Sequence, residues 1–241
     1  SADLNATNTA DAPDRVAPQA LDGIAIDGDV LGSVYADAAS ANKGATAGAI
    51  SGDINLGATG SRSFTLLDNV NTTFDFATVS GVISGSAGLT KNGAGMLILS
   101  GANTYSGDTI LSNGILVVRS IGTAGATSSN LGTNVGGGSL WLQSGGVTSP
   151  FIYAGSGEVT TRPIVIGNVT AQYIEASGSG PLEITNLINA GGYAANKTIY
   201  LKGVNTDQNT ISSVLADSGT YTLSISKSDG GVWVLNPPTL N

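Results

Sequence analysis

Residues 89–118 read LTKNGAGMLILSGANTYSGDTILSNGILVV. Two short apolar runs, Leu97–Leu99 and Leu116–Val118, stand between turn-forming Gly, Asn, Asp and Ser residues. Alternation with a period of two places every second side chain on one face of a strand, whereas an amphipathic helix needs a period of about 3.6. The stretch therefore predicts short β-strands joined by tight turns.

The same alternation recurs from about residue 57 to residue 235. Of the 241 residues, 41% are hydrophobic and 35 are Gly, so the chain can bury a core while turning often. These features predict an all-β fold. Further alternating runs are Phe64–Leu66, Val79–Ile83, Leu140–Leu142, Ile164–Ile166, Leu182–Ile184, Ile199–Leu201 and Trp233–Leu235. The residues predicted to face the core are Leu97, Leu99, Leu116, Ile199, Leu201, Trp233 and Leu235.

The chain also repeats itself. Residues Leu89–Leu99 match Ile225–Leu235 without gaps, and the surroundings of Arg62 are echoed around Arg162. Repeated short strands with Gly and Asn turns suit a solenoid, in which each coil stacks on the last and buries a continuous core. Coils of roughly 20 residues would give about nine coils between residues 57 and 235.

A β-sandwich is the competing architecture. Its hairpins favour two-residue Asn-Gly or Asp-Gly turns. Such pairs occur at Asn92-Gly93, Asn113-Gly114 and Asp229-Gly230, so local hairpins stay open at this point.

The quoted stretch closely resembles the autotransporter-associated β-strand repeat of bacterial passenger-type surface proteins. The resemblance implies a right-handed parallel β-helix that is secreted or displayed at the cell surface of a diderm bacterium. It extends over roughly 57–235, so we expect a β-solenoid repeat domain at 57–241 and an N-terminal extension at 1–56. The matching positions are Leu89, Lys91, Gly93, Gly95, Leu97, Leu99, Gly101, Asn103, Tyr105, Gly107, Thr109, Gly114 and Leu116.

Charge and composition exclude several classes of partner. The net charge is −8, with 9 Lys and Arg against 17 Asp and Glu, which disfavours nucleic acid because phosphate binding needs clustered cations. The chain contains no Cys and no His, so thiolate or imidazole metal sites and a His base are absent. The apolar runs are far shorter than the roughly 20 residues of a membrane helix. We therefore expect no cofactor, no metal, no nucleic acid partner and no membrane insertion.

Two residue types recur at equivalent repeat positions. Lys91 and Lys227 are predicted to lie along the coil surface, with the stem packed and the ammonium in water. Asn103 and Asn205 each follow a strand after a Gly, and we expect them to form turns through side-chain-to-backbone bonds or to stack in a ladder.

The acidic residues form no recognisable catalytic or metal motif. Asp27-Gly28-Asp29 offers two carboxylates, too few to specify a Ca²⁺ site. Glycosidase chemistry needs two opposed carboxylates, and Glu158, Glu175 and Glu183 are the only Glu residues. We therefore expect the protein not to be an enzyme.

Aromatic residues leave an alternative function open. Trp141, Tyr153, Tyr173 and Trp233 would support a carbohydrate-binding or polysaccharide-processing β-helix if they formed one sugar platform. Trp233 stands where Leu97 stands in the other copy and is predicted to be core, whereas Trp141 lies between two core positions and is predicted to face outward.

The favoured interpretation is a non-catalytic extracellular structural protein, either a self-assembling fibre subunit or an adhesin-like stalk. An open solenoid end exposes unpaired backbone groups that another chain can use. We expect homopolymers in which residues 1–56 act as an assembly arm, with contact to a surface polysaccharide as a further expectation. The expected assembly residues are Ile24, Ile26, Trp233 and Leu235.

Overall fold

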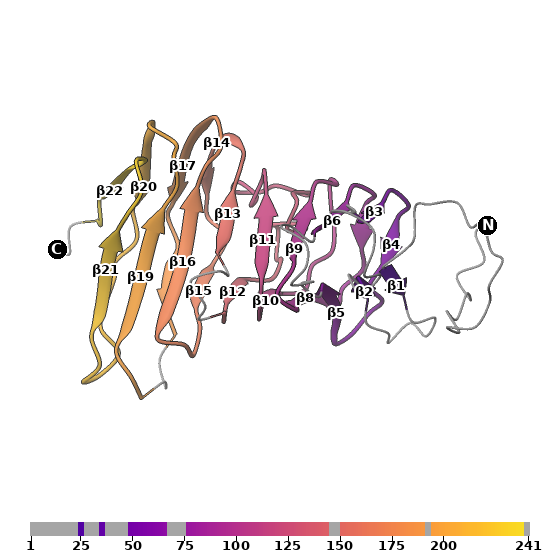
Figure 1. Cartoon of the computed structure of the whole chain (residues 1–241), viewed down its shortest axis with the longest axis horizontal. Helices are drawn as coiled ribbons and strands as arrows, with labels where there is room; N and C mark the ends of the chain where they lie inside the picture. Colours follow the sequence, from indigo (N-terminus) through magenta and orange to yellow (C-terminus); the bar gives the residue numbers. More distant parts are fainter. Residues whose placement is uncertain are drawn as a thin grey trace, which may run out of the picture.

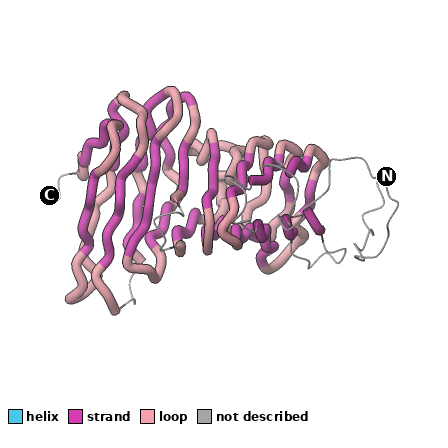
Figure 2. The backbone as a smooth tube through the Cα atoms, in the orientation of Figure 1, coloured by secondary structure: helices cyan, strands magenta, loops and turns pink. Residues whose placement is uncertain are grey.

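The computed structural model describes residues 24–26, 34–36, 48–66, 76–144, 150–190 and 194–238, the first two ranges as backbone only. Strands form an elongated stack, with β1 at one end and β21 and β22 at the other (Figure 1). The described chain consists of strands and connecting turns (Figure 2). None of its segments is a helix of the length and apolarity needed to cross a membrane.

Two eight-stranded sheets and a third face form the stack. Sheet A contains β1 (Ile24–Ile26), β2 (Val34–Ala36), β5 (Ser61–Leu66), β8 (Gly88–Asn92), β10 (Thr109–Leu111), β12 (Leu140–Leu142), β15 (Ile164–Ile166) and β18 (Leu187–Asn189). Sheet B contains β3 (Gly48–Ile50), β6 (Phe76–Val79), β9 (Met96–Leu99), β11 (Ile115–Val118), β13 (Phe151–Tyr153), β16 (Ala171–Ala176), β19 (Lys197–Lys202) and β21 (Leu223–Lys227). The third face contains the pair β4 (Ile54–Asn55) and β7 (Ile83–Ser84), and sheet C with β14 (Ser156–Thr160), β17 (Gly180–Ile184), β20 (Gln208–Ile211) and β22 (Val232–Leu235).

Strand pairing identifies the stack as a parallel β-solenoid. The chain visits sheet A, then sheet B, then the third face, and returns to sheet A one level higher. Within the described residues every strand pair is parallel except β1 with β2, so the sandwich alternative is not what forms. The predicted all-β parallel β-helix is confirmed.

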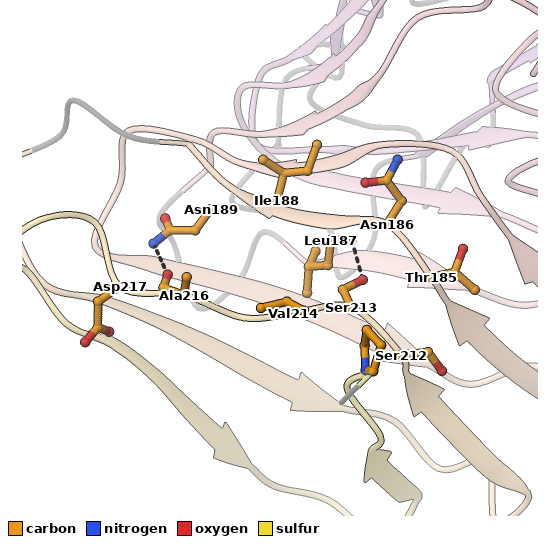
Figure 3. A pocket seen from close by; sticks show the side chains of 11 residues that line it. Thr185, Asn186, Leu187, Ile188, Asn189, Ser212, Ser213, Val214, Ala216 and Asp217 are labelled. Atoms are coloured by element: carbon orange, nitrogen blue, oxygen red, sulfur yellow. Dashed lines mark hydrogen bonds between the residues drawn. The ribbon is translucent and has the colours of Figure 1, made fainter. Parts of the chain in front are cut away.

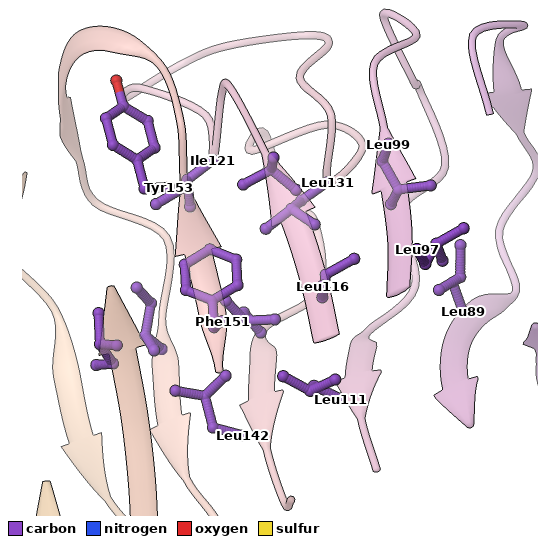
Figure 4. Packing of buried hydrophobic residues seen from close by; sticks show 14 of the residues in the cluster. Leu89, Leu97, Leu99, Leu111, Leu116, Ile121, Leu131, Leu142, Phe151 and Tyr153 are labelled. Atoms are coloured by element: carbon purple, nitrogen blue, oxygen red, sulfur yellow. The ribbon is translucent and has the colours of Figure 1, made fainter. Parts of the chain in front are cut away.

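Inward-facing columns of aliphatic side chains form the core. Leu97 of β9 pairs with Leu116 of β11, which pairs with Phe151 of β13, and all three are buried. Figure 4 shows these residues stacked between the sheets. Burial of one such side chain contributes about 1.5–3 kcal/mol. The predicted burial of Leu97, Leu99, Leu116, Ile199 and Leu201 is confirmed.

The predicted burial of Leu235 is wrong, and that of Trp233 holds only in part. Leu235 is 48% exposed, and Trp233 is half-buried with its indole N–H donating to the Lys202 carbonyl at 2.9 Å. Both lie on β22, the last strand of sheet C in the described chain. Alternation points Leu235 along the same column as Ile211, but no described coil covers it.

Coil length varies more than the sequence suggests. Leu89 pairs with Thr109, which is 20 residues later, but Leu116 pairs with Phe151, which is 35 residues later. The difference is a long connection, residues 119–139, between β11 and β12. Seven strands of sheet B therefore follow residue 57, namely β6, β9, β11, β13, β16, β19 and β21, fewer than the roughly nine coils expected.

Glycines are required where coils meet at corners. A Cβ on Gly101 would lie 2.1 Å from the carbonyl oxygen of Gly81 in the coil below. Gly114 has a φ of 70° and its Cβ would lie 2.2 Å from the carbonyl oxygen of Gly93. A residue with a Cβ would collide with the backbone at either position, and the positive φ of Gly114 is a second reason why that position requires Gly.

The segment before residue 57 contributes strands to the same stack. β3 pairs with β6 and β4 pairs with β7, both in parallel. β2 pairs with β5, and β1 lies beyond β2 as the end strand of sheet A.

Candidate contact surfaces

Lys91 lies inside the solenoid, so the prediction of a wet ammonium is wrong for this residue. It stands on β8 between Phe64 and Leu111 in register, and its side chain is fully buried. Its Nζ donates to the carbonyls of Asn92 and Gly93 at 2.7 Å and to that of Asn113 in the next coil at 3.0 Å. The alternation that places Leu89 in the core also places Lys91 there, two residues later. The charge of Lys91 nevertheless led to the prediction that it lies at the surface.

Lys227 repeats this turn at the end of the described stack. Its Nζ donates to the carbonyls of Ser228 at 2.6 Å and Asp229 at 2.8 Å, but the residue is exposed. Asp229 has a φ of 64°, matching the left-handed Gly93. The two copies of the motif lie on different faces, since Lys91 is in sheet A and Lys227 in sheet B. The motif therefore encodes a turn between strands rather than a particular face.

The free energy of unfolding should rise with pH because of Lys91. Burial lowers the pKa of the Lys91 ammonium from 10.5 to about 7. Between these two values the unfolded chain binds more protons than the folded chain, so stability rises with pH in this window and is flat below it. Urea titrations at pH 7 and about pH 9.5 should show a gain approaching 1.4 kcal/mol per pH unit that Lys91→Met lacks.

Two other lysines provide the controls for this pH dependence. Burial also lowers the pKa of Lys197, but this contribution is present in wild type and in Lys91→Met, so it cancels in their difference. Lys227→Met changes the exposed copy of the motif and should keep the wild-type slope. An equal slope in wild type and Lys91→Met would contradict the assignment.

Arg162 holds the long connection 119–139 against the stack through hydrogen bonds. The fully buried guanidinium donates from Nε to Ile121 at 2.7 Å and from Nη1 to Gly138 at 2.7 Å, in both cases to the carbonyl. Its Nη2 donates to the carbonyls of Gly132 at 3.0 Å and Thr133 at 2.8 Å. Burial lowers the pKa of Arg162. The similarity between the sequences around Arg62 and Arg162 drew attention to this position, but it did not predict that the side chain bonds to the connection 119–139.

The side chains of Asn103 and Asn205 bond to backbone groups, as predicted, but their partners lie in neighbouring coils rather than in a local turn. The Oδ1 of Asn103 accepts from Ile83 N–H at 2.8 Å, and its Nδ2 donates to the Asn130 carbonyl at 2.7 Å. Asn205 Nδ2 donates to the Gly178 carbonyl at 2.8 Å. These buried amides hold the backbone of adjacent coils, so they are not available to a ligand.

The three glutamates lie on three different strands, and each accepts a hydrogen bond from the protein. Glu158 on β14 accepts from the N–H groups of Ile121 and Gly122, both at 2.8 Å. Glu175 on β16 accepts from Ser177, and Glu183 on β17 accepts from Ser212, both at 2.6 Å. No group of three or more Asp or Glu side chains that could hold a metal occurs in the described residues, which do not include Asp27–Asp29.

The four aromatic residues considered as a platform lie apart. Tyr153 is buried in the core, Trp141 faces outward from sheet A and Trp233 lies on sheet C. Tyr173 instead stacks on Tyr200, with ring centroids 4.6 Å apart and planes 9° from parallel. The outward orientation of Trp141 is confirmed, since it is half-buried between buried Leu140 and Leu142.

Four strands of sheet B, β6, β9, β11 and β13, present a largely apolar outer face, which the sequence analysis missed. Their outward positions alternate with the core positions, are half-buried, and are apolar except for Thr78 of β6. Strand register aligns the apolar residues into two columns along the stack, and the second column continues into Glu175 and Lys202. The first column is Phe76, Met96 and Ile115, and the second contains Ile98, Val117 and Ile152. We call these six residues the sheet B strip.

A groove lies at the end of sheet A. β18 is the last strand of that sheet, whereas the other faces continue to β21 and β22. Residues 212–217 lie beside β18 and bond to it through side chains rather than through a backbone ladder. Ser213 Oγ accepts from Leu187 N–H at 2.6 Å, and Asn189 Nδ2 donates to the Ala216 carbonyl at 3.0 Å (Figure 3). The groove has a volume of about 410 Å³. It is lined by Thr185, Asn186, Leu187, Ile188, Asn189, Ser212, Ser213, Val214, Ala216, Asp217 and Pro238.

Comparison with known proteins found a matching repeat family and a similar adhesin. The passenger-associated-transport-repeat family matches residues 89–118. The adhesin BmaC autotransporter of Brucella suis biovar 1 (strain 1330) is 33% identical over 156 residues, which cover 64% of this chain and 4% of that protein. The chain thus spans a small part of this relative, and no solved structure matches it. Residues 89–118 are a passenger-associated transport repeat, so the chain contains an autotransporter passenger-type repeat, and it is secreted or displayed at the surface of a Gram-negative bacterium.

Proposed function

We propose that the chain is a non-catalytic, adhesin-like rod that contacts its target through the sheet B strip. The observation that carries this proposal is the alignment of six apolar side chains on the outer face of four consecutive sheet B strands. Each side chain of the strip is half-buried, and an aligned apolar patch that reaches the surface is typical of an interaction site. The relative's description as an adhesin supports the same role.

The rest of the molecule supports a scaffold rather than catalysis. The buried cations Lys91 and Arg162 donate to backbone carbonyls, and the carboxylate of Glu158 accepts from backbone N–H groups. These charges are used to hold coils and connections together. A stack of parallel sheets with a continuous core is also stiff, which suits a rod that holds a contact face away from the cell surface.

Adhesion of coated beads tests the proposal. Beads carrying the chain should be retained on a cultured epithelial monolayer under flow, and albumin-coated beads should not. The double variant Ile98→Glu with Val117→Glu should reduce retention roughly tenfold, because desolvating two carboxylates opposes apolar contact. Circular dichroism should show that the variant stays folded, since both side chains face outward.

Val159→Glu is the matched control for the bead assay. Val159 is an exposed apolar residue on β14, away from sheet B, so its replacement should leave retention unchanged. Equal losses in the control and the double variant would contradict a role for the strip.

Contact with surface polysaccharide is a second candidate. The stacked Tyr173 and Tyr200 lie on the outer face of sheet B beside Glu175 and Lys202, which supply polar groups next to aromatic surface. If purified bacterial polysaccharide competes for bead retention and Tyr200→Ala removes the competition, this candidate replaces the strip as the contact site.

A further inference from the structure

We propose that the outer face of sheet A binds a neutral glycan, with the ring of Trp141 stacked against a sugar. The site lies in the middle of the stack, on β10, β12 and β15, and on a different sheet from the sheet B strip. The inference is therefore independent of the adhesive role proposed for that strip. It commits to an uncharged, extended glycan as the ligand.

An apolar column surrounds Trp141 on this face. Trp141 of β12 pairs with Ile110 of β10 on one side and with Val165 of β15 on the other. Alternation points all three outward, since the residues on either side of each are buried. Val165 is 5% exposed although it faces outward, whereas Ile110 and Trp141 are half-buried. The indole ring therefore stands between two apolar neighbours and still reaches the surface.

The indole N–H of Trp141 does not hold the ring in place. In the part of the chain that the structure describes, Nε1 is buried and has no hydrogen-bond partner. Leaving a buried donor unpaired costs stability, and a Phe would fill an apolar position without that cost. What Trp offers beyond Phe is a larger and more electron-rich π face, which attracts the C–H groups of a sugar. The ring face, rather than the N–H, therefore explains a Trp at this position.

A polar column runs beside the apolar one. Ser112 N–H donates to the Lys91 carbonyl at 3.0 Å, so Ser112 follows Asn92 in the next coil. Gln143 N–H donates to the Leu111 carbonyl at 2.9 Å, so Gln143 follows Ser112 in the same way. Hydroxyl and amide groups of this kind can donate to and accept from sugar hydroxyls. Successive members are one strand spacing of about 4.8 Å apart, close to the length of one hexose in an extended glycan.

Charge favours an uncharged ligand at this site. Among the described strands β8, β10, β12 and β15, the one ionisable side chain is Lys91, and it lies inside the solenoid. Asp108 precedes β10, and its carboxylate already accepts from the Ser139 N–H at 2.7 Å. The net charge of −8 would also repel a polyanion. A glycan without charged groups is therefore the class of ligand that this surface complements.

Tryptophan fluorescence tests the inference. Trp141 and Trp233 are the two tryptophans of the chain, so Trp233→Phe leaves Trp141 as the one reporter. Neutral hexasaccharides of glucose, mannose, galactose or N-acetylglucosamine should, for at least one sugar, change its emission saturably with a Kd below about 1 mM. Heparin and polylysine, as charged polymers, should leave the emission unchanged. Calorimetric titration of the wild-type chain with the same hexasaccharide should give the same Kd and controls for the Trp233 substitution.

Substitutions at the site separate binding from folding. Trp141→Ala should abolish glycan binding, and Trp141→Phe should raise the Kd roughly tenfold because its ring face is smaller. The urea midpoint of Trp141→Phe should be no lower than that of wild type, since the substitution removes an unpaired donor. Gln143→Ala should raise the Kd roughly threefold through loss of one polar contact. Tyr200→Ala, on the outer face of sheet B, is the matched aromatic control and should bind the glycan like wild type.

Several outcomes would overturn the inference. One is no response to any of the neutral hexasaccharides, and another is an unchanged Kd in Trp141→Ala. Binding of polylysine at Trp141 in place of a glycan would assign the ring to a cationic partner. Loss of glycan binding in Tyr200→Ala alone would place the glycan on sheet B. Bead retention depends on Ile98 and Val117 of the sheet B strip, so that assay decides the proposed function separately.

Discussion

Leu99→Asp is expected to abolish the folded state of the central coils. Leu99 is 0% exposed and lies in register between Val79 and Val118, so an aspartate there would have no water around it. Burial of an unpaired carboxylate costs about 5 kcal/mol or more, which equals much of the 5–15 kcal/mol that stabilises a typical domain. Urea denaturation followed by circular dichroism should show little or no cooperative transition.

The repeat supplies a matched control for this substitution. Leu235 occupies the position of Leu99 in the second copy of the motif, but it is 48% exposed. Leu235→Asp should change the free energy of unfolding by at most about 1 kcal/mol in dilute solution. If both variants lost the same stability, burial would not be the cause and the core assignment would fail.

Alternation along single strands was enough to predict the β-strands and most of the core, whereas the prediction of a parallel β-helix depended on the internal repeats and on the family resemblance. Leu97 and Leu99 lie two residues apart, and Leu116 occupies the equivalent place in the next run. Their common orientation could be predicted because alternation is a local property of an extended backbone. The Gly and Asn turns between the runs similarly predicted where each strand ends, because a positive φ such as that of Gly114 needs Gly.

Other features depend on what lies in the adjacent coil, which no local pattern specifies. Leu235 continues an inward column, yet its burial requires a further coil above it. Lys91 is buried because Asn113 supplies a carbonyl from the next coil, whereas Lys227 has the same turn and is exposed. The predictions for these residues differed from the structure for this reason.

The candidate contact surfaces were harder to predict than the fold. The outward positions of sheet B, such as Ile98 and Val117, were visible as apolar residues between core residues, but a single strand does not show that they align. Alignment requires the register between strands, which the coil lengths determine. Since one coil adds 35 residues where another adds 20, the register could not be counted from the sequence. Whether Ile24, Ile26, Trp233 and Leu235 act in assembly stays a prediction.

Arg162→Met should release the connection 119–139 from the stack. The substitution keeps the apolar stem but leaves the carbonyls of Ile121, Gly132, Thr133 and Gly138 without the donors that now hold them. Loss of charged hydrogen bonds from a buried site destabilises by about 3–5 kcal/mol. Hydrogen exchange followed by mass spectrometry should show the protection of residues 119–139 falling more than that of β9 and β16.

Two further arginine variants decide whether geometry or charge matters at this position. Arg162→Lys keeps the charge but offers one ammonium in place of a planar fork, so it should recover only part of the protection. Arg119→Met, at an exposed residue at the start of the same connection, should exchange like wild type. If Arg162→Lys were fully protected, the fork would not be needed. If Arg162→Met exchanged like wild type, the connection would be held by its own bonds, including that from Asn134 Nδ2 to the Thr123 carbonyl at 2.9 Å.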